Sequence, residues 1–534
     1  MSLSAGVGKH ETTCFIPGIG MMGYGQPHNT VKEVATPLYA RSLFLRDDKQ
    51  NIFLLIHLEQ AFVSLAIKEE IMIRLMEKHP EWKLTESQVM ITAQHTHSAP
   101  GGYSHYPFYN FTIPGFQIRV FETICDGIMN AIEEASKNIE LVDLKFGKHH
   151  IDENKKVAFN RSIEAYLNNH DASAFAAVDR QMIGLSVNTK EGKQKAFLNW
   201  FGVHCTSISS FNHRIHHDNK GVAANLYEQN HPGVTAFFLQ AAAGDISPNY
   251  IWDSELKRNR GTFKDQYENA ESNGEIQFRE AEKIEAASTI EGEIKTFSSF
   301  FDMKQAVAPA AHGVSFFQGT KEGPGVPSAL AQILKVISRG VKYNSLFKDP
   351  DSKKFYDAHF PKDVLLDHRN GSFLGMPLRL WKKLPQIPDP TVEAFRKEAK
   401  NESINTTPWV PEILPFQMIV IGPLLIAAVP GEITTMAARR LKKFIEEKLE
   451  DSTISEIVIS SYANAYMGYI TTPEEYFTQS YEAGHTVYGR GTLEGICSGF
   501  EELLKEFSGT ISKSPKIRPF HFPAEELALR SIPK

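Results

Sequence analysis

The stretch Val89-Met90-Ile91-Thr92-Ala93-Gln94-His95-Thr96-His97 joins an apolar run to two histidines, and the breaker segment Ser-Ala-Pro-Gly-Gly follows it at 98–102. The apolar run predicts a buried strand that opens into a loop. Residues two apart in a strand project to the same face, so we expect the imidazoles of His95 and His97 to leave the strand end together. Such a pair is typical of a zinc site, or of a zinc ligand beside a catalytic histidine. An isolated pair more often caps a strand.

The composition of the chain favours a globular protein and excludes several classes of partner and site. Its 534 residues are 42% hydrophobic and 11% aromatic, which is enough for a large buried core. The formal net charge is −6 and long basic runs are missing, so we expect no nucleic-acid partner. The cysteines are scattered without C-x-x-C spacing, which indicates neither a disulfide framework nor a thiolate metal site. They are Cys14, Cys125, Cys205 and Cys497.

Apolar runs in the sequence are short. The longest, Met418 to Val429, is interrupted by Gly422-Pro423 and is shorter than the ~18–20 residues that a spanning helix needs. We therefore expect a soluble protein with no transmembrane segment. The first thirty residues show no basic start followed by an apolar stretch, so no secretory signal is visible. The sequence leaves the compartment and the oligomeric state open.

Strand-like segments alternate with helical ones, which predicts an α/β fold: a large mixed α/β catalytic domain with central β-sheets flanked by helices. We expect this domain to span residues 1–508, followed by a short C-terminal tail at 509–534, because no linker divides the chain. Phe347–Pro415 is rich in proline and polar residues and predicts long connecting structure. The predicted strands are Ile52–Leu58, Gln88–Ala93, Ala196–Val203, Val234–Leu239, Met418–Ile421, Leu424–Val429 and Ile457–Ser460. The predicted helices cover 120–132, Thr434–Leu449 and Thr492–Phe507, with a further exposed helix within Asp253–Ile294.

Four later segments repeat the pattern of the first, with an apolar strand ending in a polar, titratable residue beside small or turn-forming ones. Loops at strand ends are where active sites are assembled. The segments are Asn199–His204, Phe238–Asn249, Val429–Glu432 and Tyr466–Tyr488.

Each of these segments also has a purely structural interpretation. A single histidine such as His204 is more often a hydrogen-bonded core residue than a metal ligand. The ligand interpretation is favoured only if His204 supplies a further imidazole to the His95 site. Ser247 is either a nucleophile, with room left by the preceding Ala-Ala-Ala-Gly, or a turn or capping residue. Glu432 precedes a predicted helix and either complements its dipole or offers an oxygen ligand. Tyrosines this dense usually line a groove or pack with satisfied hydroxyls. In a further fragment, Phe159-Asn160-Arg161-Ser162, the Arg161 guanidinium either holds an oxyanion or a substrate oxygen, or forms a surface ion pair.

Taken together and in this order, these segments resemble the neutral, non-lysosomal ceramidase family, in its bacterial form. The similarity extends from about Gly18 to Phe507, and such a series is far more specific than any single member. The matching pieces are MMGYG at Met21–Gly25, ITAQHTHSAPGGY at Ile91–Tyr103, FNRSIEAYLNN at Phe159–Asn169, NWFGVHCTS at Asn199–Ser207, DNKG at Asp218–Gly221, GDISPN at Gly244–Asn249, VPGEITTMAARRL at Val429–Leu441 and GYITTPEEYFTQSYE at Gly468–Glu482.

The resemblance implies a zinc-dependent amidohydrolase that cleaves the N-acyl bond of ceramide to sphingosine and a free fatty acid. It implies that ceramide or another N-acyl lipid is drawn from a membrane or micelle surface. Carried over by position, it implies one zinc ion, a nucleophilic serine at Ser247, and three residues that orient the amide and stabilise its oxyanion. The implied zinc ligands are His95, His204, Glu432 and Tyr469, and the three orienting residues are His97, Arg161 and Tyr481.

Two nucleophiles are compatible with this chemistry. Zinc can act as a Lewis acid and can also lower the pKa of a bound water to about 7. Either Ser247 attacks to form an acyl-enzyme or a zinc-bound water attacks directly, and we expect water to be the final nucleophile in either scheme. Donors such as His97 and Tyr481 would lie where negative charge develops.

The sequence departs from the family pattern in three ways. It ends soon after the last shared motif, so we expect the β-rich C-terminal domain typical of the family to be missing. Ser209–His217 is rich in histidine, and residues 240–243 (Gln-Ala-Ala-Ala) are smaller than is usual. We expect both segments to lie beside the pocket, so zinc chemistry is better supported than the identity of the substrate.

Two alternatives stay open. One is a zinc hydrolase of a smaller N-acyl amine or peptide-like amide, and the other is a non-catalytic lipid- or metal-binding relative. A narrow apolar tunnel above the metal would favour a lipid substrate, and a wide polar cleft would favour the smaller amide.

Overall fold

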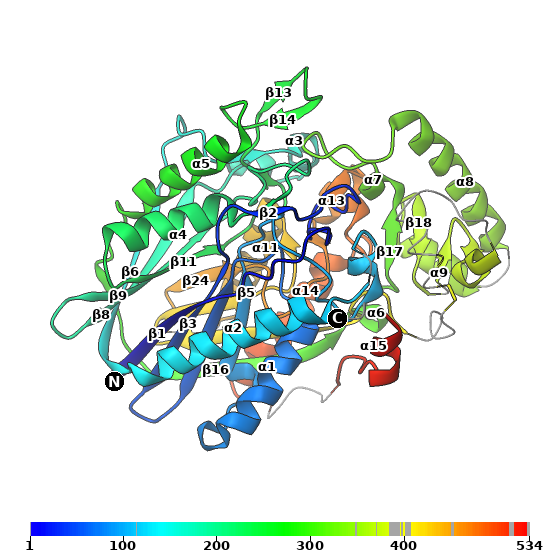
Figure 1. Ribbon diagram of the computed structural model, residues 1–534. Coiled ribbons are helices and arrows are strands. Elements are labelled where there is room, and N and C mark those ends of the chain that lie inside the picture. The colour runs from blue at the N-terminus through cyan, green and yellow to red at the C-terminus, as the bar shows by residue number, and fades with distance from the viewer. Residues whose placement is uncertain are drawn as a thin grey trace.

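Two β-sheets are stacked face to face, with helices on both outer sides (Figure 1), and the predicted mixed α/β architecture is confirmed. This arrangement comes from a computed structural model. It describes residues 2–113, 115–347, 350–369, 371–383, 396, 399–400, 407–449, 453–511 and 517–530. No helix within these ranges is long and apolar enough to cross a bilayer.

The larger sheet has nine strands in the order β11-β9-β8-β6-β1-β3-β4-β5, with β15 also paired to β6. Most neighbours are antiparallel, but the β4–β5 and β9–β11 pairs are parallel. The strands are β1 (Leu3–Glu11), β3 (Tyr39–Asp47), β4 (Ile52–Leu58), β5 (Val89–Ala93), β6 (Glu140–His150), β8 (Gln181–Thr189), β9 (Gln194–Phe201), β11 (Thr235–Gln240) and β15 (Ser288–Ile290).

The second sheet is built from β16 (Ile294–Asp302), β21 (Ile413–Ile421), β22 (Leu424–Ala428) and β24 (Glu456–Ser460), in that order. Strand side chains alternate between faces, so each sheet contributes one apolar face to the core between them. Ala5 and Val7 of β1 belong to the same buried cluster as Ile419 and Ile426 of the second sheet. The predicted strands are confirmed, including the two that flank Gly422-Pro423.

Helices cover the outer faces of both sheets. On the larger sheet α2 (Ile118–Lys137) lies along β1 and β3 with α1 (Leu65–Lys78) beside it, and α4 (Asp218–Asn230) lies on β11 with α5 (Gln266–Ala281) against it. On the smaller sheet α14 (Thr492–Phe507) lies on β16 and β21, next to α11 (Thr435–Lys448). Helical segments at 120–132, 434–449, 492–507 and within 253–294 are therefore confirmed.

A small lobe stands at the right of Figure 1. It consists of the sheet β17 (Ala311–Gly313), β18 (Val364–Asp367), β19 (Ser372–Phe373) and β20 (Met376–Pro377), with α7 (Val314–Phe317), α8 (Ser328–Leu346), α9 (Pro350–Ala358) and η5 (Leu378–Lys383). The expectation of connecting structure from Phe347 is wrong for residues 350–383. The strands here have two to four residues, which is too short for a visible period in the sequence.

Short elements complete the described chain. They are β2 (Glu33–Val34), η1 (Pro80–Trp82), η2 (Glu86–Gln88), η3 (Pro107–Asn110), β7 (Phe159–Asn160), α3 (Ile163–Leu167), η4 (Ala172–Ala174), β10 (Arg214–Ile215), β12 (Ile246–Ser247), β13 (Ile251–Asp253), β14 (Arg258–Arg260), α6 (Met303–Ala306), β23 (Glu432–Ile433), β25 (Tyr469–Ile470), α12 (Pro473–Phe477), α13 (Tyr481–Gly484) and α15 (Ala524–Arg530). Just before α15, Phe522 is buried against Tyr106, with ring centroids 5.1 Å apart. The predicted boundary near residue 508 stays a prediction.

Two glycines in β1 allow α2 to lie directly on the larger sheet. A β-carbon added to Gly6 would lie 1.9 Å from the carbonyl oxygen of Ala135, and one added to Gly8 would lie 2.0 Å from that of Ala131. Both distances are far inside van der Waals contact, and the atoms met belong to the backbone of the helix. The helix position is therefore set by the absence of side chains at these two positions.

We expect Gly6→Ala and Gly8→Ala each to lower the free energy of unfolding by about 1–3 kcal/mol, because the helix must move away from the strand. Differential scanning calorimetry at a fixed scan rate measures this as a lower apparent Tm. Gly340→Ala is the matched control: Gly340 lies in α8 with open space around it. There the substitution should be neutral or stabilising by up to about 1 kcal/mol. Equal Tm values for all three variants would contradict this account.

Candidate active site

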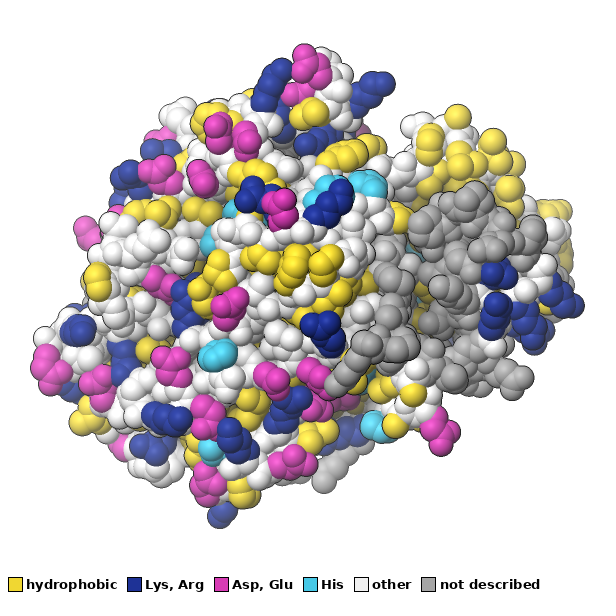
Figure 2. Space-filling model, viewed as in Figure 1, with side chains coloured by type: hydrophobic (Ala, Val, Ile, Leu, Met, Phe, Trp, Pro, Cys, Tyr) yellow, Lys and Arg dark blue, Asp and Glu magenta, His cyan; other side chains and the backbone are white. Residues whose placement is uncertain are grey.

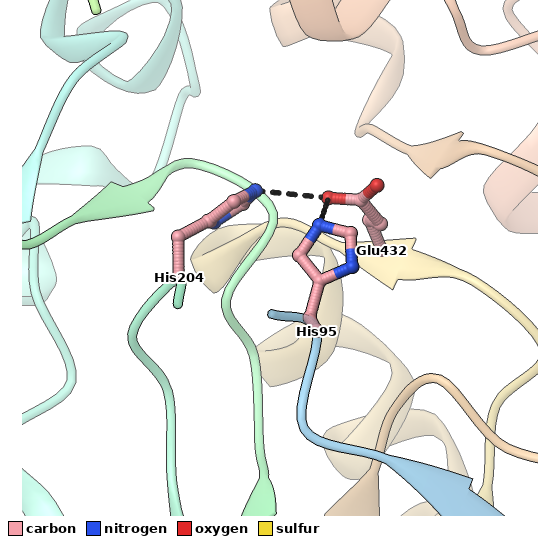
Figure 3. Close-up of side chains that lie close together, drawn as sticks. All are labelled: His95, His204 and Glu432. Carbon is pink, nitrogen blue, oxygen red and sulfur yellow. Dashed lines mark ion pairs between the residues drawn. The ribbon is translucent and has the colours of Figure 1, made fainter. Parts of the chain in front are cut away.

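Strand ends from both sheets meet at one place and bring three side chains together (Figure 3). His95 follows β5, His204 follows β9, and Glu432 follows β22. Each of these strands has a parallel neighbour, and the carboxyl ends of parallel strands are a common location for sites.

The three side chains form a compact, buried cluster. Glu432 Oε2 lies 3.4 Å from His95 Nε2 and 3.0 Å from His204 Nε2. One ligand atom from each residue lies within 4.8 Å of the others, and all three side chains are at most 3% exposed. Among the described residues this is the one group of three or more histidine, cysteine or carboxylate side chains close enough to share a metal ion.

Backbone carbonyls orient both imidazoles. His95 Nδ1 contacts the Ala61 carbonyl oxygen, and His204 Nδ1 lies 3.0 Å from the Ile246 carbonyl oxygen. A carbonyl only accepts hydrogen bonds, so each Nδ1 carries a hydrogen and each ring turns its Nε2 atom inward. Two lone pairs and a carboxylate oxygen then converge, which is repulsive unless a proton or a cation lies between them. This donor set fits a divalent cation such as zinc, whose histidine ligands usually donate their other N–H in this way.

Two phenols hold the carboxylate from the other side. Tyr462 Oη donates to Glu432 Oε2 at 3.0 Å, and Tyr466 Oη donates to Glu432 Oε1. Burial alone would raise the pKa of the Glu432 carboxyl, but positive charge and N–H donation from the His95 and His204 rings, when they carry a proton on Nε2, outweigh burial and hold that pKa well below its usual value. The carboxylate is therefore ionised and fixed in place. Tyr462 is a residue that sequence reasoning missed, although it follows the predicted strand Ile457–Ser460.

The fourth predicted ligand, Tyr469, lies at the edge of this cluster. Its Oη is 3.3 Å from His204 Nε2 and accepts a hydrogen bond from Arg161 Nη2 at 2.9 Å. Burial and the nearby Glu432 raise the pKa of the Tyr469 phenol well above its ordinary value. A bound dication would act in the opposite direction and favour the phenolate. The phenol is thus within reach of the cluster, and its ligand role stays a prediction.

His97 lies directly beside His95, with the two Nε2 atoms 3.0 Å apart. The strand ends at Ala93, and His95 has a left-handed backbone with φ of 78°. The two rings therefore meet because the chain turns, and not because of the strand alternation that predicted the pair. Burial, followed by His95 and His204, lowers the pKa of His97 well below 6.5, so its imidazole is neutral at neutral pH.

Arg161 and Tyr481 form the opposite wall. Arg161 donates through Nε to Glu482 at 2.9 Å, and Tyr469 and Glu482 raise its pKa well above the ordinary value although burial acts against them. It is a nearly buried, permanently charged side chain, which excludes the surface ion pair considered from sequence. The Tyr481 ring lies 5.7 Å from the Arg161 guanidinium. Burial and Glu432 raise the pKa of Tyr481, so its hydroxyl is a neutral donor.

Ser247 lies apart from the open space of the site. It is fully buried in β12, and its Oγ accepts a hydrogen bond from the Asn249 N–H at 2.8 Å. The preceding residue, Ile246, supplies the carbonyl that orients His204. Ser247 is not among the described residues that line the cavity.

A cavity of about 510 Å³ runs from the cluster into the small lobe. Its lining includes His95, His97, His204 and Glu432 from the cluster region, and Leu334 and Trp381 from the small lobe. Most of the wall between them is aromatic or aliphatic. The apolar lining residues include Met22, Phe62, Phe108, Phe111, Phe316, Phe317, Val326, Leu365 and Phe373. The cavity is therefore an apolar pocket with a polar end.

Sequence reasoning missed two further charged or titratable residues of the cavity wall. Glu322 lies in the glycine-rich loop and accepts hydrogen bonds from Thr206 at 3.2 Å and Asn249 at 3.0 Å. His485 is 4% exposed, and neither of its ring nitrogens has a hydrogen-bond partner among the described residues. The loop that contains Glu322 is rich in glycine but lacks phosphate-loop spacing, so the sequence did not indicate a site residue there. Only the density of aromatic residues around His485 could have indicated that this histidine lines a cavity.

The two divergent segments contribute no residue to the cavity wall but lie directly behind it. Gln240 Nε2 instead donates to the carbonyls of Gln94 at 2.8 Å and Val203 at 2.7 Å, the residues just before His95 and His204. From the histidine-rich segment, the His217 carbonyl accepts a hydrogen bond from Gln94 Nε2. Both segments therefore support the loops that carry the imidazoles, rather than the space in front of them.

Fold and cluster together define an α/β enzyme with a buried candidate metal site at the polar end of an apolar pocket. The family model for neutral/alkaline non-lysosomal ceramidase (N-terminal part) matches residues 3–378 and 398–498. The chain belongs to this family.

Individual relatives agree with the family match. The neutral ceramidase of Pseudomonas aeruginosa is 30% identical over 508 residues, which cover 91% of this chain and 69% of that protein. The neutral ceramidase of Mycobacterium tuberculosis is 28% identical, with 94% of this chain and 77% of that protein covered. Among solved structures, a ceramidase complexed with C2 superposes with a TM-score of 0.81 at 27% identity and covers 98% of this chain and 77% of that chain. The crystal structure of the Pseudomonas aeruginosa enzyme gives 0.76 at 26% identity, covering 98% of this chain and 78% of that chain.

Gly23, in the MMGYG segment, provides the space for His97. It has φ of +121°, and a β-carbon there would lie 2.4 Å from His97 Cγ. We expect Gly23→Ala to displace the His97 ring and lower kcat by at least about tenfold, while metal content measured by mass spectrometry stays unchanged. Gly25→Ala, also at positive φ but with open space around it, controls for backbone strain. If both variants lose the same activity, the contact with His97 is not the cause.

Proposed function

We propose that this protein hydrolyses the N-acyl amide bond of ceramide, releasing sphingosine and a free fatty acid, with a zinc ion held by His95, His204 and Glu432 and completed by Tyr469. The observation that carries the proposal is the convergence of two carbonyl-oriented Nε2 atoms and one ionised carboxylate at the polar end of an apolar pocket. Family membership supports the same reaction.

Zinc at this cluster would act as a Lewis acid on the amide carbonyl and would lower the pKa of water. The surrounding residues fix the orientation of the three side chains by hydrogen bonds. Tyr462 and Tyr466 fix the Glu432 carboxylate, and the Ala61 and Ile246 carbonyls fix the two rings. Hydrogen bonds of this kind set the orientation and basicity of metal ligands.

Three side chains are placed to act on the amide. Tyr481 presents a neutral hydroxyl to the cavity, and we assign it as a donor to the developing oxyanion. Arg161, positively charged behind Tyr469, favours negative charge at the same end of the pocket. His97 is neutral and lines the cavity, so its imidazole can accept a proton from the nucleophile and return it to the departing amine.

Water is the nucleophile that we favour. Ser247 Oγ is fully buried, accepts the Asn249 N–H, and does not contribute to the cavity wall. A serine that attacks the carbonyl must lie within about 3–3.5 Å of the substrate carbon. Ser247 would instead support the loop that carries Asn249, whose amide donates to Glu322 at 3.0 Å.

The shape of the pocket favours a lipid over a small amide. Its lining is largely aromatic and aliphatic, and its volume of about 510 Å³ suits a hydrocarbon chain rather than a hydrated peptide. We therefore assign an N-acyl lipid, delivered from a lipid surface, as the substrate. The non-catalytic alternative is disfavoured because His97, Arg161 and Tyr481 line the same cavity as the His95–His204–Glu432 cluster.

Metal removal tests the proposal directly. We expect a chelator to abolish fatty-acid release from ceramide and added zinc to restore it, with one zinc per chain by mass spectrometry. Glu432→Gln removes the ionised oxygen, and we expect it to lower zinc affinity by at least about tenfold. Full activity of metal-free protein would contradict zinc chemistry. Absence of release from any N-acyl amphiphile at full zinc occupancy would contradict the hydrolase itself.

Ser247→Ala separates the two nucleophiles. If water attacks, we expect the variant to keep at least about a tenth of the wild-type kcat, whereas loss of a covalent nucleophile lowers kcat by about 10³-fold or more. Tyr481→Phe is the comparison, since it keeps the ring and loses one oxyanion donor, for an expected loss of about 10²-fold in kcat. Trapping of an acyl-enzyme on Ser247 in a rapid-quench experiment would overturn the water scheme.

A further inference from the structure

Helix α8 carries an apolar face that no described part of the protein covers. Its members recur at spacings of three and four residues, which places them on one side of the helix. Val336 is 68% exposed, and Phe347, directly after the helix, is 75% exposed. Figure 2 shows hydrophobic side chains gathered over this part of the small lobe. The face, called the α8 face below, consists of Leu330, Ile333, Val336, Ile337, Tyr343 and Phe347.

The flank of the α8 face is basic. Lys335, Arg339 and Lys342 follow one another at spacings of four and three residues, and residues 328–347 contain no aspartate or glutamate. The whole chain, in contrast, has a net charge of −6. Arg339 pairs with Asp363 at 2.8 Å, and the Lys342 ammonium lies over the Phe360 ring. An apolar stripe beside a basic flank is the pattern of a helix that lies in a lipid–water interface.

The α8 face adjoins the mouth of the pocket. Leu334, on the packed side of the same helix, lines the cavity, and so does much of the loop 319–326 that runs into α8. Of the lining residues, Gly25 and Gly325 are exposed, so the cavity opens between the loops 23–27 and 319–326. A lipid that leaves a surface at α8 would therefore enter the cavity without crossing open water.

We propose that the α8 face is an interfacial docking surface that inserts into the headgroup region of an anionic bilayer. Its use in delivering substrate rests on the proposed function, whereas the binding itself does not. A second copy of the chain fits this face less well. In a symmetric contact each helix meets its own equivalent, so the basic flanks of the two copies would face each other. A bilayer containing anionic lipid satisfies the apolar stripe and the positive flank together.

Vesicle sedimentation tests the docking surface. Wild-type protein should bind phosphatidylcholine vesicles that contain phosphatidylglycerol, and Val336→Glu/Phe347→Glu should bind at least about tenfold more weakly. Ile73→Glu/Met76→Glu is the matched control, because these residues are 47% and 53% exposed on α1, away from the pocket. This control should bind as wild type does. Lys335→Gln/Lys342→Gln should weaken binding to the anionic vesicles and leave binding to pure phosphatidylcholine unchanged.

Turnover separates this proposal from the proposed function. Val336→Glu/Phe347→Glu should lower hydrolysis of vesicle-embedded ceramide by the same factor as binding, and leave kcat/KM on a water-soluble short-chain ceramide unchanged. Vesicle binding by a protein that hydrolyses no ceramide would overturn the function and retain the docking surface.

Three results would overturn the docking surface. They are absence of vesicle binding by wild-type protein, equal binding by the wild type and Val336→Glu/Phe347→Glu, and a wild-type dimer in analytical ultracentrifugation that this variant abolishes.

Discussion

The convergence of the His95 and His204 Nε2 atoms on the Glu432 carboxylate is the interaction on which the rest of the site depends. Glu432 Oε2 lies 3.4 Å from His95 Nε2 and 3.0 Å from His204 Nε2, and these electron-rich atoms repel one another unless a proton or a cation lies between them. Carbonyls behind each ring and phenols behind the carboxylate hold them there nevertheless. The surrounding protein therefore maintains a geometry that becomes favourable only with positive charge at its centre, as expected of a site organised before its ion binds.

Support for this arrangement comes from residues outside the cluster itself. Gln240 bridges the carbonyls of Gln94 and Val203 and so ties together the loops that end β5 and β9. Gly23 leaves room for His97. The residues that position the site are thus distributed over the ends of both sheets. Small changes behind the ligands therefore alter the geometry of the cluster.

Much of the fold was predictable because its long elements have clear periods. The strands around 52–58 and 89–93 and the helix at 492–507 follow directly from hydrophobic spacing. The small lobe was missed because its strands are too short to show alternation. In the site, His95, His204 and Glu432 each follow a recognisable strand, but the reason His95 meets His97 is a positive φ that spacing does not reveal. Tyr462, Glu322 and Gln240 act through contacts between distant segments, for which one sequence carries no signal.

The ligands also come from chain segments that are far apart. His95 follows a strand of the larger sheet and Glu432 a strand of the smaller one, with 336 residues between them along the chain. An ion held by both would act as a cross-link between the two layers, much as a disulfide closes a long loop, and its binding energy would add to the cohesion of the sandwich. The same bound ion would then serve both catalysis and resistance to unfolding.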